Sequence, residues 1–169
     1  PKTVNAWSMA GGRMALYTGL IEKIKPTDDE LAQVLAHEIA HALAKHTAEK
    51  MSVALATSLG VLAVGVATDN RNIATGASAA ALVAITLPNS RTAESEADEI
   101  GIQLAARAGY NPAAAVTLWQ KMSKESGGSS FDFLSTHPSS GKRIERLQSL
   151  VPKMMPYYEE QKPHPVYPL

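Results

Sequence analysis

The chain has 169 residues, with 16 acidic and 16 basic side chains and no cysteine. This length is sufficient for one domain with its own core, and a formal net charge of zero provides no basic surplus for nucleic acid. Without cysteine there are no disulfides or thiolate metal sites, so any metal ion would be bound by histidine and carboxylate. We expect one domain over residues 1–169 that does not bind nucleic acid. Because the chain begins at Pro1 without a signal-like stretch, we interpret it as a mature or trimmed form.

The first predicted elements are two short strands joined by a tight turn. Apolar runs at residues 3–9 and 13–18 flank Ala10-Gly11-Gly12, and Gly-Gly between two such runs is typical of a hairpin. Two strands are only marginally stable alone, so a third strand elsewhere stays open. The hairpin is either purely structural or presents an edge to which an extended peptide adds as a further strand, and the sequence favours neither interpretation.

A helix is predicted to follow, from Thr27 to about Lys50. Thr27 is suited to the N-cap, and Glu30 stands three residues later, where it completes a capping box. Apolar residues then recur at helical spacing through residues 31–43.

This helix carries the motif His37-Glu38-Ile39-Ala40-His41. Residues four apart lie on one face of a helix, so His37 and His41 can both bind one metal ion. The motif has the HExxH pattern, in which two neutral histidines bind zinc and the glutamate takes a proton from water at the metal. The pattern therefore predicts His37 and His41 as zinc ligands and Glu38 as the general base.

Two apolar stretches rich in small residues come next, at 52–67 and 73–87. A membrane-spanning helix needs about 20 strongly apolar residues, whereas these stretches are shorter and diluted by Ala, Gly, Ser and Thr. We predict a helical hairpin over residues 52–87 that packs near the metal motif. The alternatives are a membrane-inserted pair and a partly disordered lid.

The remaining chain is predicted to form three helices and a tail. The first begins at Asn89 and ends before Gly109, a residue suited to the position after a helix. The second covers residues 111–125, with an N-cap followed by proline, and the third covers residues 141–150. The Pro- and Tyr-rich residues 151–169 are expected to lie extended on the surface. The fold class is therefore α+β and mainly helical, with a small antiparallel sheet.

A metal site on this motif needs a third ligand, and His46 is one candidate. The metzincin pattern requires a glycine and then a histidine where this chain has Ala44 and Thr47. His46 comes one residue too early, and without the glycine the helix is not expected to break and bring a later histidine round. We interpret His46 as a surface histidine or as a residue that contacts the site from outside the ligand set.

The sequence ESEAD at residues 94–98 offers a carboxylate ligand from a separate helix. Glu94 and Asp98 are one turn apart on one face, where two like charges normally destabilise a helix. A zinc ion removes the conflict if Glu94 binds the metal while Asp98 accepts the N–H of a ligand histidine and fixes its tautomer. Glu96 points elsewhere on this helix. The alternative is a solvated acidic face.

Three segments together carry a resemblance to a known family. HEIAH at 37–41, SRTAESEAD at 90–98 and STHPSSGKRIERL at 135–147 occur in this order. The chain resembles the gluzincin peptidases of the HtpX and CAAX-prenyl-protease family, and is most similar to their Oma-type branch and bacterial periplasmic members. The resemblance implies a zincin-like metalloprotease domain, with the small sheet packed on the HExxH helix. It also implies one zinc ion per chain, bound by His37, His41 and Glu94.

The resemblance also suggests an activity: zinc-dependent hydrolysis of peptide bonds in unfolded or damaged proteins, in quality control at a bacterial periplasm or cell envelope. His137 is our candidate for stabilising the oxyanion; the alternatives are a gate that blocks the water position at zinc, and a residue that only fixes a loop. We interpret Arg143 as a structural ion-pair partner. Two rival functions are a membrane-embedded peptidase and a zinc-binding, chaperone-like module without cleavage. The predicted partners are polypeptide substrates; peripheral membrane association and the oligomeric state stay open.

Overall fold

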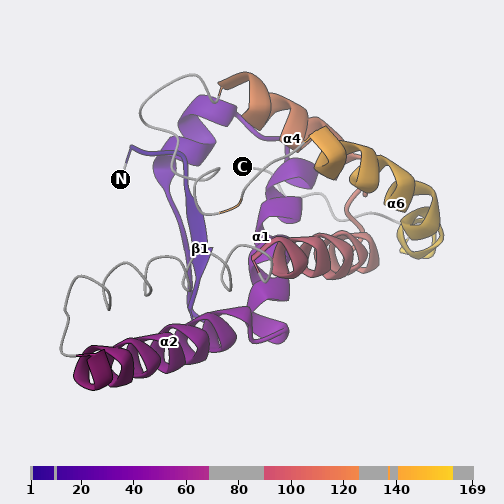
Figure 1. Ribbon diagram of the computed structural model, residues 1–169. Helices are drawn as coiled ribbons and strands as arrows, with labels where there is room; N and C mark the ends of the chain where they lie inside the picture. Colours follow the sequence, from indigo (N-terminus) through magenta and orange to yellow (C-terminus); the bar gives the residue numbers. More distant parts are fainter. Residues whose placement is uncertain (1, 10, 69–89, 126–136, 138–140, 162–169) are drawn as a thin grey trace.

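The computed structural model describes residues 2–9, 11–68, 90–125, 137 and 141–161. Within these ranges the chain is mainly helical with one two-stranded antiparallel sheet, as predicted (Figure 1). Residues 90–107 are also helical. In chain order the other elements are β1 (Ala6–Ser8), β2 (Met14–Leu16), the π-helical turn η1 (Leu20–Ile24), α1 (Asp28–Leu43), α2 (His46–Thr68), α4 (Ala114–Glu125) and α6 (Gly141–Glu159).

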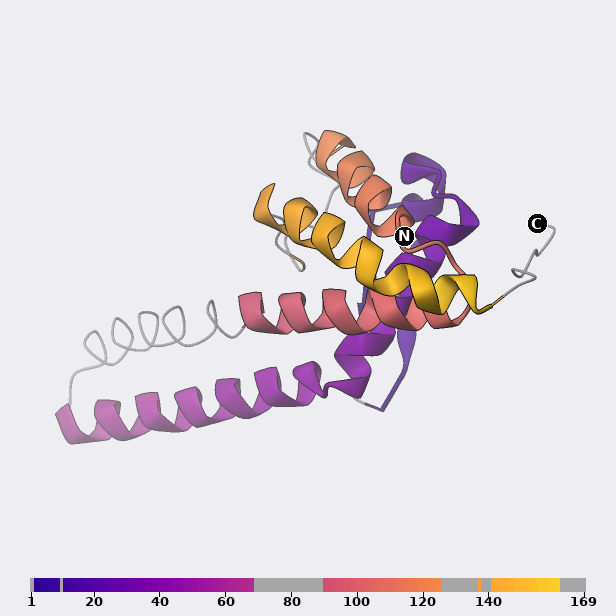
Figure 2. The same cartoon turned by 90° about the vertical axis from the view of Figure 1, so that its right-hand side faces the viewer.

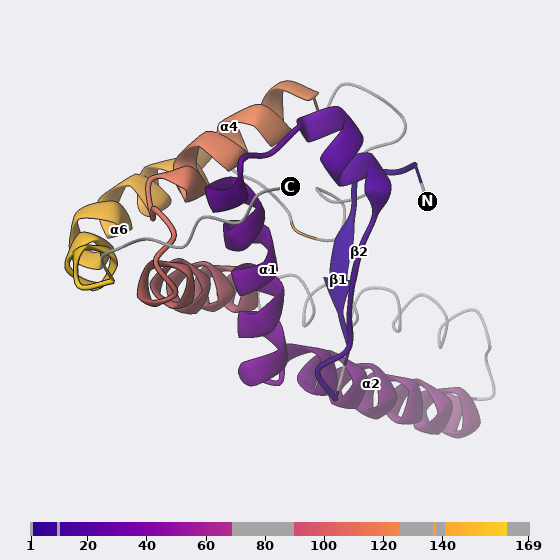
Figure 3. The same ribbon diagram turned by 180° about the vertical axis from the view of Figure 1, so that it is seen from behind.

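The predicted hairpin is confirmed as an antiparallel pair of β1 and β2, in which Trp7 lies opposite Ala15. Gly11 and Gly12 both have positive φ angles, 92° and 78°, which glycine adopts without the strain that other residues incur. Figure 3 shows β1 between α1 and β2, so the hairpin lies alongside the helix that carries the metal motif. A third strand is not present in the part of the chain that the structure describes.

The helix α1 begins as predicted but ends earlier. The Thr27 hydroxyl accepts the Glu30 N–H, and the Glu30 carboxylate accepts the Thr27 N–H, which forms the predicted capping box. The predicted continuation to about Lys50 is wrong, because α1 stops at Leu43 and α2 starts at His46. Lys45 between them has a φ of 58°, a left-handed conformation that costs a non-glycine residue about 1–2 kcal/mol. The helix therefore breaks at this point without a glycine.

Beyond its start beside α1, the helix α2 extends away from α4 and α6, as the purple-to-magenta ribbon in Figure 2 shows. Along it, Leu55, Leu59 and Leu62 are exposed. The first half of the predicted hairpin is therefore helical, whereas residues 73–87 lie outside the described residues. Among the described helices, none is long and apolar enough to cross a membrane.

The helix over residues 90–107 ends as the sequence predicts. Gly109 has a φ of 86°, and its N–H donates to the Ala106 carbonyl while the Tyr110 N–H donates to the Ala105 carbonyl. These two bonds form a Schellman motif, which satisfies carbonyls at the helix end. Next, the Asn111 side chain accepts the Ala113 N–H, and α4 begins at Ala114, slightly later than predicted.

The expectation of an extended tail after residue 150 is wrong for its first part, because α6 continues to Glu159. Pro152 and Pro156 are one turn apart on the exposed face, where the carbonyls that lose a helical donor can reach water. Met154 on the opposite face is buried, and Tyr157 lies under the Arg107 guanidinium at 4.1 Å. Burial of one face therefore maintains the helix through both prolines. Residues 162–169 lie outside the described residues.

The core lies between α1, the hairpin, α4 and α6, and large apolar side chains from each of them meet there. Its buried members come from every one of these elements and from the helix over residues 90–107: Val4, Ala6, Leu20, Ile24, Val34, Ile102, Ala106, Ala115, Leu118, Trp119, Met122, Leu147, Leu150 and Met154. On α1, His37 lies next to this core, where it lines a small cavity together with Val34 and Ile102.

Candidate metal centre

The two motif histidines meet on the buried side of α1. Helical spacing places His37 and His41 one turn apart, and their Nε2 atoms lie 3.1 Å from each other. The helix over residues 90–107 comes very close to them at Gly101, where a Cβ atom would lie only 3.0 Å from the Cα of His37. A glycine at this position therefore allows the two helices to approach until their polar side chains touch.

Glu94 completes a compact group of three side chains. Its Oε2 lies 3.3 Å from His37 Nε2, and its Oε1 lies 3.3 Å from His41 Nε2. The Nδ1 atom of His137 is 3.3 Å from His37 Nε2 and 3.1 Å from Glu94 Oε2. All four side chains are buried, and one ligand atom from each lies within 4.8 Å of the others.

These separations fit a tetrahedral metal site. With metal–ligand bonds of about 2.0–2.1 Å, neighbouring ligands of a tetrahedral ion are about 3.3–3.4 Å apart. The separations of 3.1–3.3 Å between His37 Nε2 and its neighbours His41, Glu94 and His137, and between His41 and Glu94, are close to such an edge, with His37 and His41 contacting different oxygens of Glu94. Imidazole nitrogen and carboxylate oxygen are also ligand types that transition metals accept. The residues present therefore fit a bound metal ion.

Glu38 lies beside this group. Its Oε1 atom is 3.2 Å from His137 Nε2, yet it accepts no hydrogen bond from the residues that the structure describes. Burial raises the pKa of Glu38, but the neighbouring imidazoles, first that of His137, outweigh burial and lower it below its ordinary value. Glu38 is therefore a buried, ionised carboxylate with a free acceptor site next to the histidine cluster.

The charges of the cluster depend on one another. Burial raises the pKa of Glu94, but hydrogen bonds from His137, His37 and His41 lower it far below the usual range. Burial lowers the pKa of His137, but the carboxylates of Glu38 and Glu94 raise it to about 9. Glu94 is therefore ionised at neutral pH, which is the form in which a carboxylate binds a cation.

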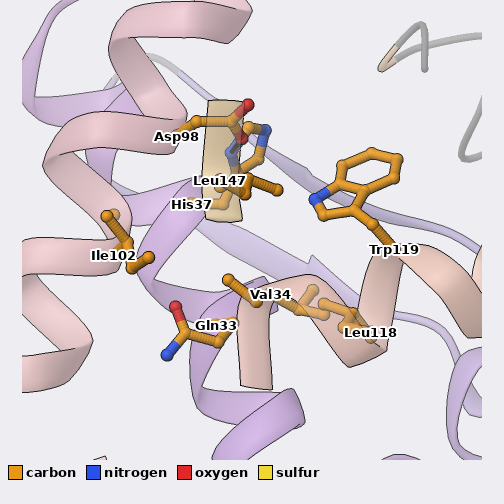
Figure 4. Close-up of a pocket in the computed structure, with 10 residues that line it drawn as sticks. Gln33, Val34, His37, Asp98, Ile102, Leu118, Trp119 and Leu147 are labelled. Carbon is orange, nitrogen blue, oxygen red and sulfur yellow. Dashed lines mark ion pairs between the residues drawn. The ribbon is translucent and has the colours of Figure 1, made fainter. Parts of the chain in front are cut away.

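Asp98 lies one turn after Glu94 and contacts the far side of His37. Its Oδ1 atom is 3.2 Å from His37 Nδ1, whereas the other ring nitrogen, Nε2, is the one near His41 and Glu94; Figure 4 shows Asp98 beside His37. A carboxylate in this position fixes which ring nitrogen carries the proton. The structure thus brings together all the predicted site residues: His37, His41, Glu38, Glu94, Asp98 and His137.

The cavity in Figure 4 has a volume of about 20 Å³ and is lined by His37, Asp98 and Trp119 among others. It is large enough for one water molecule but not for a peptide.

Arg143 reaches deeper into the site than the sequence indicates. Its guanidinium is buried, donates to Glu94 Oε2 at 3.2 Å and to Asp98 Oδ1 at 2.6 Å, and stacks on the ring of Trp119 at 3.7 Å. The expected ion-pair role is present, but its two carboxylate partners were not foreseen. A tertiary contact between α6 and residues 90–107 leaves no local pattern in the sequence.

His46 is the second residue whose contacts sequence reasoning missed. It is buried, with its Nδ1 2.9 Å from His41 Nδ1 and its Nε2 3.3 Å from Glu96 Oε2. It therefore contacts a motif histidine from outside, in agreement with one of the two interpretations of the sequence, and the surface alternative is wrong. The helix break at Lys45 brings His46 to this position, and no glycine or proline in the sequence predicts that break.

Comparison with known proteins gives a consistent result. The model of peptidase family M48 matches residues 1–151. The mitochondrial metalloendopeptidase OMA1 of Schizosaccharomyces pombe is 39% identical over 155 residues, which covers 89% of this chain and 44% of that protein. The beta-barrel assembly-enhancing protease of Yersinia pestis is 32% identical, over 91% of this chain and 34% of its own length.

The metalloprotease LoiP of Escherichia coli is 29% identical over 87% of this chain and 58% of that protein. The chain spans less than half the length of the OMA1 proteins that it matches.

Proposed function

The chain belongs to peptidase family M48, and from this we propose that it is a zinc-dependent metalloendopeptidase. One observation carries the proposal: the Nε2 atoms of His37 and His41 and the carboxylate of Glu94 lie 3.1–3.3 Å from one another, with the ionised Glu38 beside them. Catalytic zinc sites have three protein ligands and a further position for chemistry, which in this structure lies next to His137. We infer that His37, His41 and Glu94 bind one zinc ion per chain.

In this proposal each residue around the metal has a distinct role. Bound zinc supplies Lewis-acid chemistry, which polarises a peptide carbonyl and lowers the pKa of water. Glu38, with its free acceptor atom, takes the proton from the attacking water and delivers it to the departing amine. Asp98 holds His37 in the tautomer with a bare Nε2, and Arg143 offsets the charges of Glu94 and Asp98.

His137 has two candidate roles, which the His137→Ala variant separates. Its Nδ1 lies at hydrogen-bonding distance from Glu94, and at ligand separation from His37, so it occupies a fourth corner of the group. If it acts as a gate there, removing its imidazole raises activity. If instead it turns towards the substrate and donates to the developing oxyanion, its removal lowers activity by about 10²–10³-fold.

The substrate class follows from the resemblance together with the sheet. We propose unfolded or damaged polypeptides as substrates, bound in extended form along an edge of the β1–β2 hairpin, with quality control in a bacterial periplasm or envelope as the role. The relatives named above include a protease whose name refers to beta-barrel assembly. The rivals stay a membrane-embedded peptidase and a zinc-binding, chaperone-like module.

Casein cleavage by the wild type and by Glu38→Gln, with zinc content measured in both, tests the activity. We expect cleavage by the wild type, a loss of about 10²–10⁴-fold in Glu38→Gln, and equal zinc in both, because the change removes a base but no ligand. Wild-type protein that contains zinc, and that cleaves nothing even after His137→Ala, would contradict the proposal and favour the binding module. Solubility without detergent separates the membrane-embedded rival.

A further inference from the structure

The two motif histidines differ in what supports their outer ring nitrogens. His37 Nδ1 contacts the buried carboxylate of Asp98, whereas His41 Nδ1 contacts another imidazole, that of His46, at 2.9 Å. His46 in turn contacts Glu96 through its other nitrogen at 3.3 Å. We propose that His46 and Glu96 are positioning residues that fix the tautomer and the ring orientation of His41. This inference rests on the proposed zinc site and assigns further residues to it.

The donors and acceptors of these three side chains allow only one direction for the hydrogen bonds from His41 through His46 to Glu96. His41 Nε2 faces His37 and Glu94, so it must be bare to bind a cation, and the proton of the neutral ring is then on Nδ1. That N–H donates to His46 Nδ1, which must also be bare, so the proton of His46 lies on Nε2. The Glu96 carboxylate, which can only accept, lies in the correct place to receive it.

The break between α1 and α2 makes this arrangement possible. On a continuous helix, position 46 would be rotated by about 140° from position 41, since each residue turns the helix by about 100°. The left-handed Lys45 turns the chain into a new direction instead, and the first residue of α2 places its ring against His41, with 5.0 Å between ring centroids. The His46 side chain is thereby buried although it begins a helix that extends away from the core.

The two outer contacts are unequal in strength. Asp98 is a buried carboxylate, whereas His46 offers an imidazole nitrogen, and its other nitrogen contacts Glu96, whose side chain is 54% exposed. An exposed carboxylate is solvated and contributes less. We therefore expect a graded effect, with Asp98 most important, His46 next and Glu96 least.

The first test needs no variant. Nitrogen NMR of the imidazoles in the wild-type protein, with and without zinc, reports which ring nitrogen of each histidine is protonated. We expect protons on Nδ1 of His41 and Nε2 of His46 in the zinc-loaded protein, where the metal occupies His41 Nε2. A proton on Nδ1 of His46 in the zinc-loaded protein would overturn the inference without touching the zinc site itself.

The second test measures the zinc dissociation constant by chelator competition in four variants. Outer contacts of ligand histidines are typically worth 10–100-fold in metal affinity. We expect a loss within that range for His46→Leu, recovery of most of it for His46→Gln, whose side-chain carbonyl can accept from His41, and a loss below about tenfold for Glu96→Gln. Thr47→Val, which changes the same junction without touching His41, is the control and should bind zinc as the wild type does.

The variants also separate the positioning role of His46 from the proposed zinc site on which it rests. Wild-type affinity in His46→Leu, or equal losses in His46→Leu and His46→Gln with both variants folded, would overturn the positioning role while the proposed zinc site stands. Failure of the wild type to bind zinc would overturn the site and this inference together. If His46→Leu does not fold, the wild-type NMR and the His46→Gln variant still decide.

Discussion

The two ends of α1 each bury a glutamate, and the comparison between them separates a structural site from a functional one. Glu30, near the start of the helix, accepts hydrogen bonds from the Thr27 N–H, the Thr117 hydroxyl and the Lys121 ammonium. Glu38, two turns later, has an oxygen that accepts none from the described residues. Both pKa values lie below the ordinary value, but only Glu30 has its acceptor sites filled.

The difference lies in the neighbours as well as in the carboxylates. Around Glu30 each polar group has a partner of opposite type, and the result is a cap and a bridge from α1 to α4. Around Glu38 the imidazoles of His37, His41 and His137 crowd together with a second carboxylate, Glu94. A buried group of three imidazoles and two carboxylates does not stabilise a fold by itself, and it is accounted for if a cation binds there.

The largest expected effect concerns Glu94, in the crowded group of side chains around Glu38. Glu94→Gln should weaken zinc binding by more than about 100-fold, beyond the range of outer contacts, because it removes a charged ligand. Glu99→Gln is the matched control, since Glu99 lies on the same helix but pairs with Arg146 at the surface, and it should bind zinc normally. Chelator competition measures both constants. Equal zinc affinities of Glu94→Gln and Glu99→Gln would contradict the metal-binding role of Glu94.

The next largest effect concerns Glu30, near the start of α1. Glu30→Ala removes the partner of Thr117 and Lys121 and half of the capping box, so we expect a loss of about 2 kcal/mol in the free energy of unfolding. Zinc affinity should stay within a factor of two of the wild type. Urea unfolding and chelator competition on the same sample measure the two quantities. A large fall in zinc affinity with little change in stability would contradict the structural role.

A smaller effect is expected from the other half of the cap. Thr27→Ala removes the hydroxyl that accepts the Glu30 N–H, a change that typically costs about 1 kcal/mol. Thr27→Ser retains the hydroxyl and should unfold close to the wild-type urea midpoint. An unchanged midpoint in Thr27→Ala would mean that the cap contributes nothing here.

The smallest effect is a dependence of stability on pH. Burial raises the pKa of Glu30, but Lys121, Thr27 and Thr117 outweigh it, so the pKa of the folded state lies below the ordinary 4.5. The stabilisation by the charged form is then fully present above pH 4.5 and is lost as the pH falls through the folded-state pKa. The difference in urea midpoint between wild type and Glu30→Gln should therefore shrink below pH 4.5. A difference that grows on acidification would contradict this sign.

Local patterns in the sequence predicted the features that depend on near neighbours. Helical spacing placed His37 and His41 on one face, the Thr27 and Glu30 pair predicted the cap, and Gly109 predicted a helix end. The misses depend on tertiary contacts. The break at Lys45 needs a strained residue that its surroundings hold in place, and α6 passes Pro152 because its opposite face is buried.

The residues around the candidate metal centre divide in the same way, into those that a local pattern indicates and those that a tertiary contact places. The spacing of Glu94 and Asp98 indicated a ligand and an outer contact on one helix face. The partners of Arg143 and His46 could not be predicted, because Arg143 comes from another helix and His46 follows a turn of the chain without a sequence signal.

The most direct test of the central claim is a crystal structure of the zinc-loaded protein, with anomalous scattering recorded at the zinc edge. The account predicts one ion per chain, about 2.0–2.1 Å from the Nε2 atoms of His37 and His41 and from the carboxylate of Glu94. The position of His137 in the same crystal would show whether it is a fourth ligand. Zinc bound elsewhere, or absent from protein crystallised with excess zinc, would contradict the account.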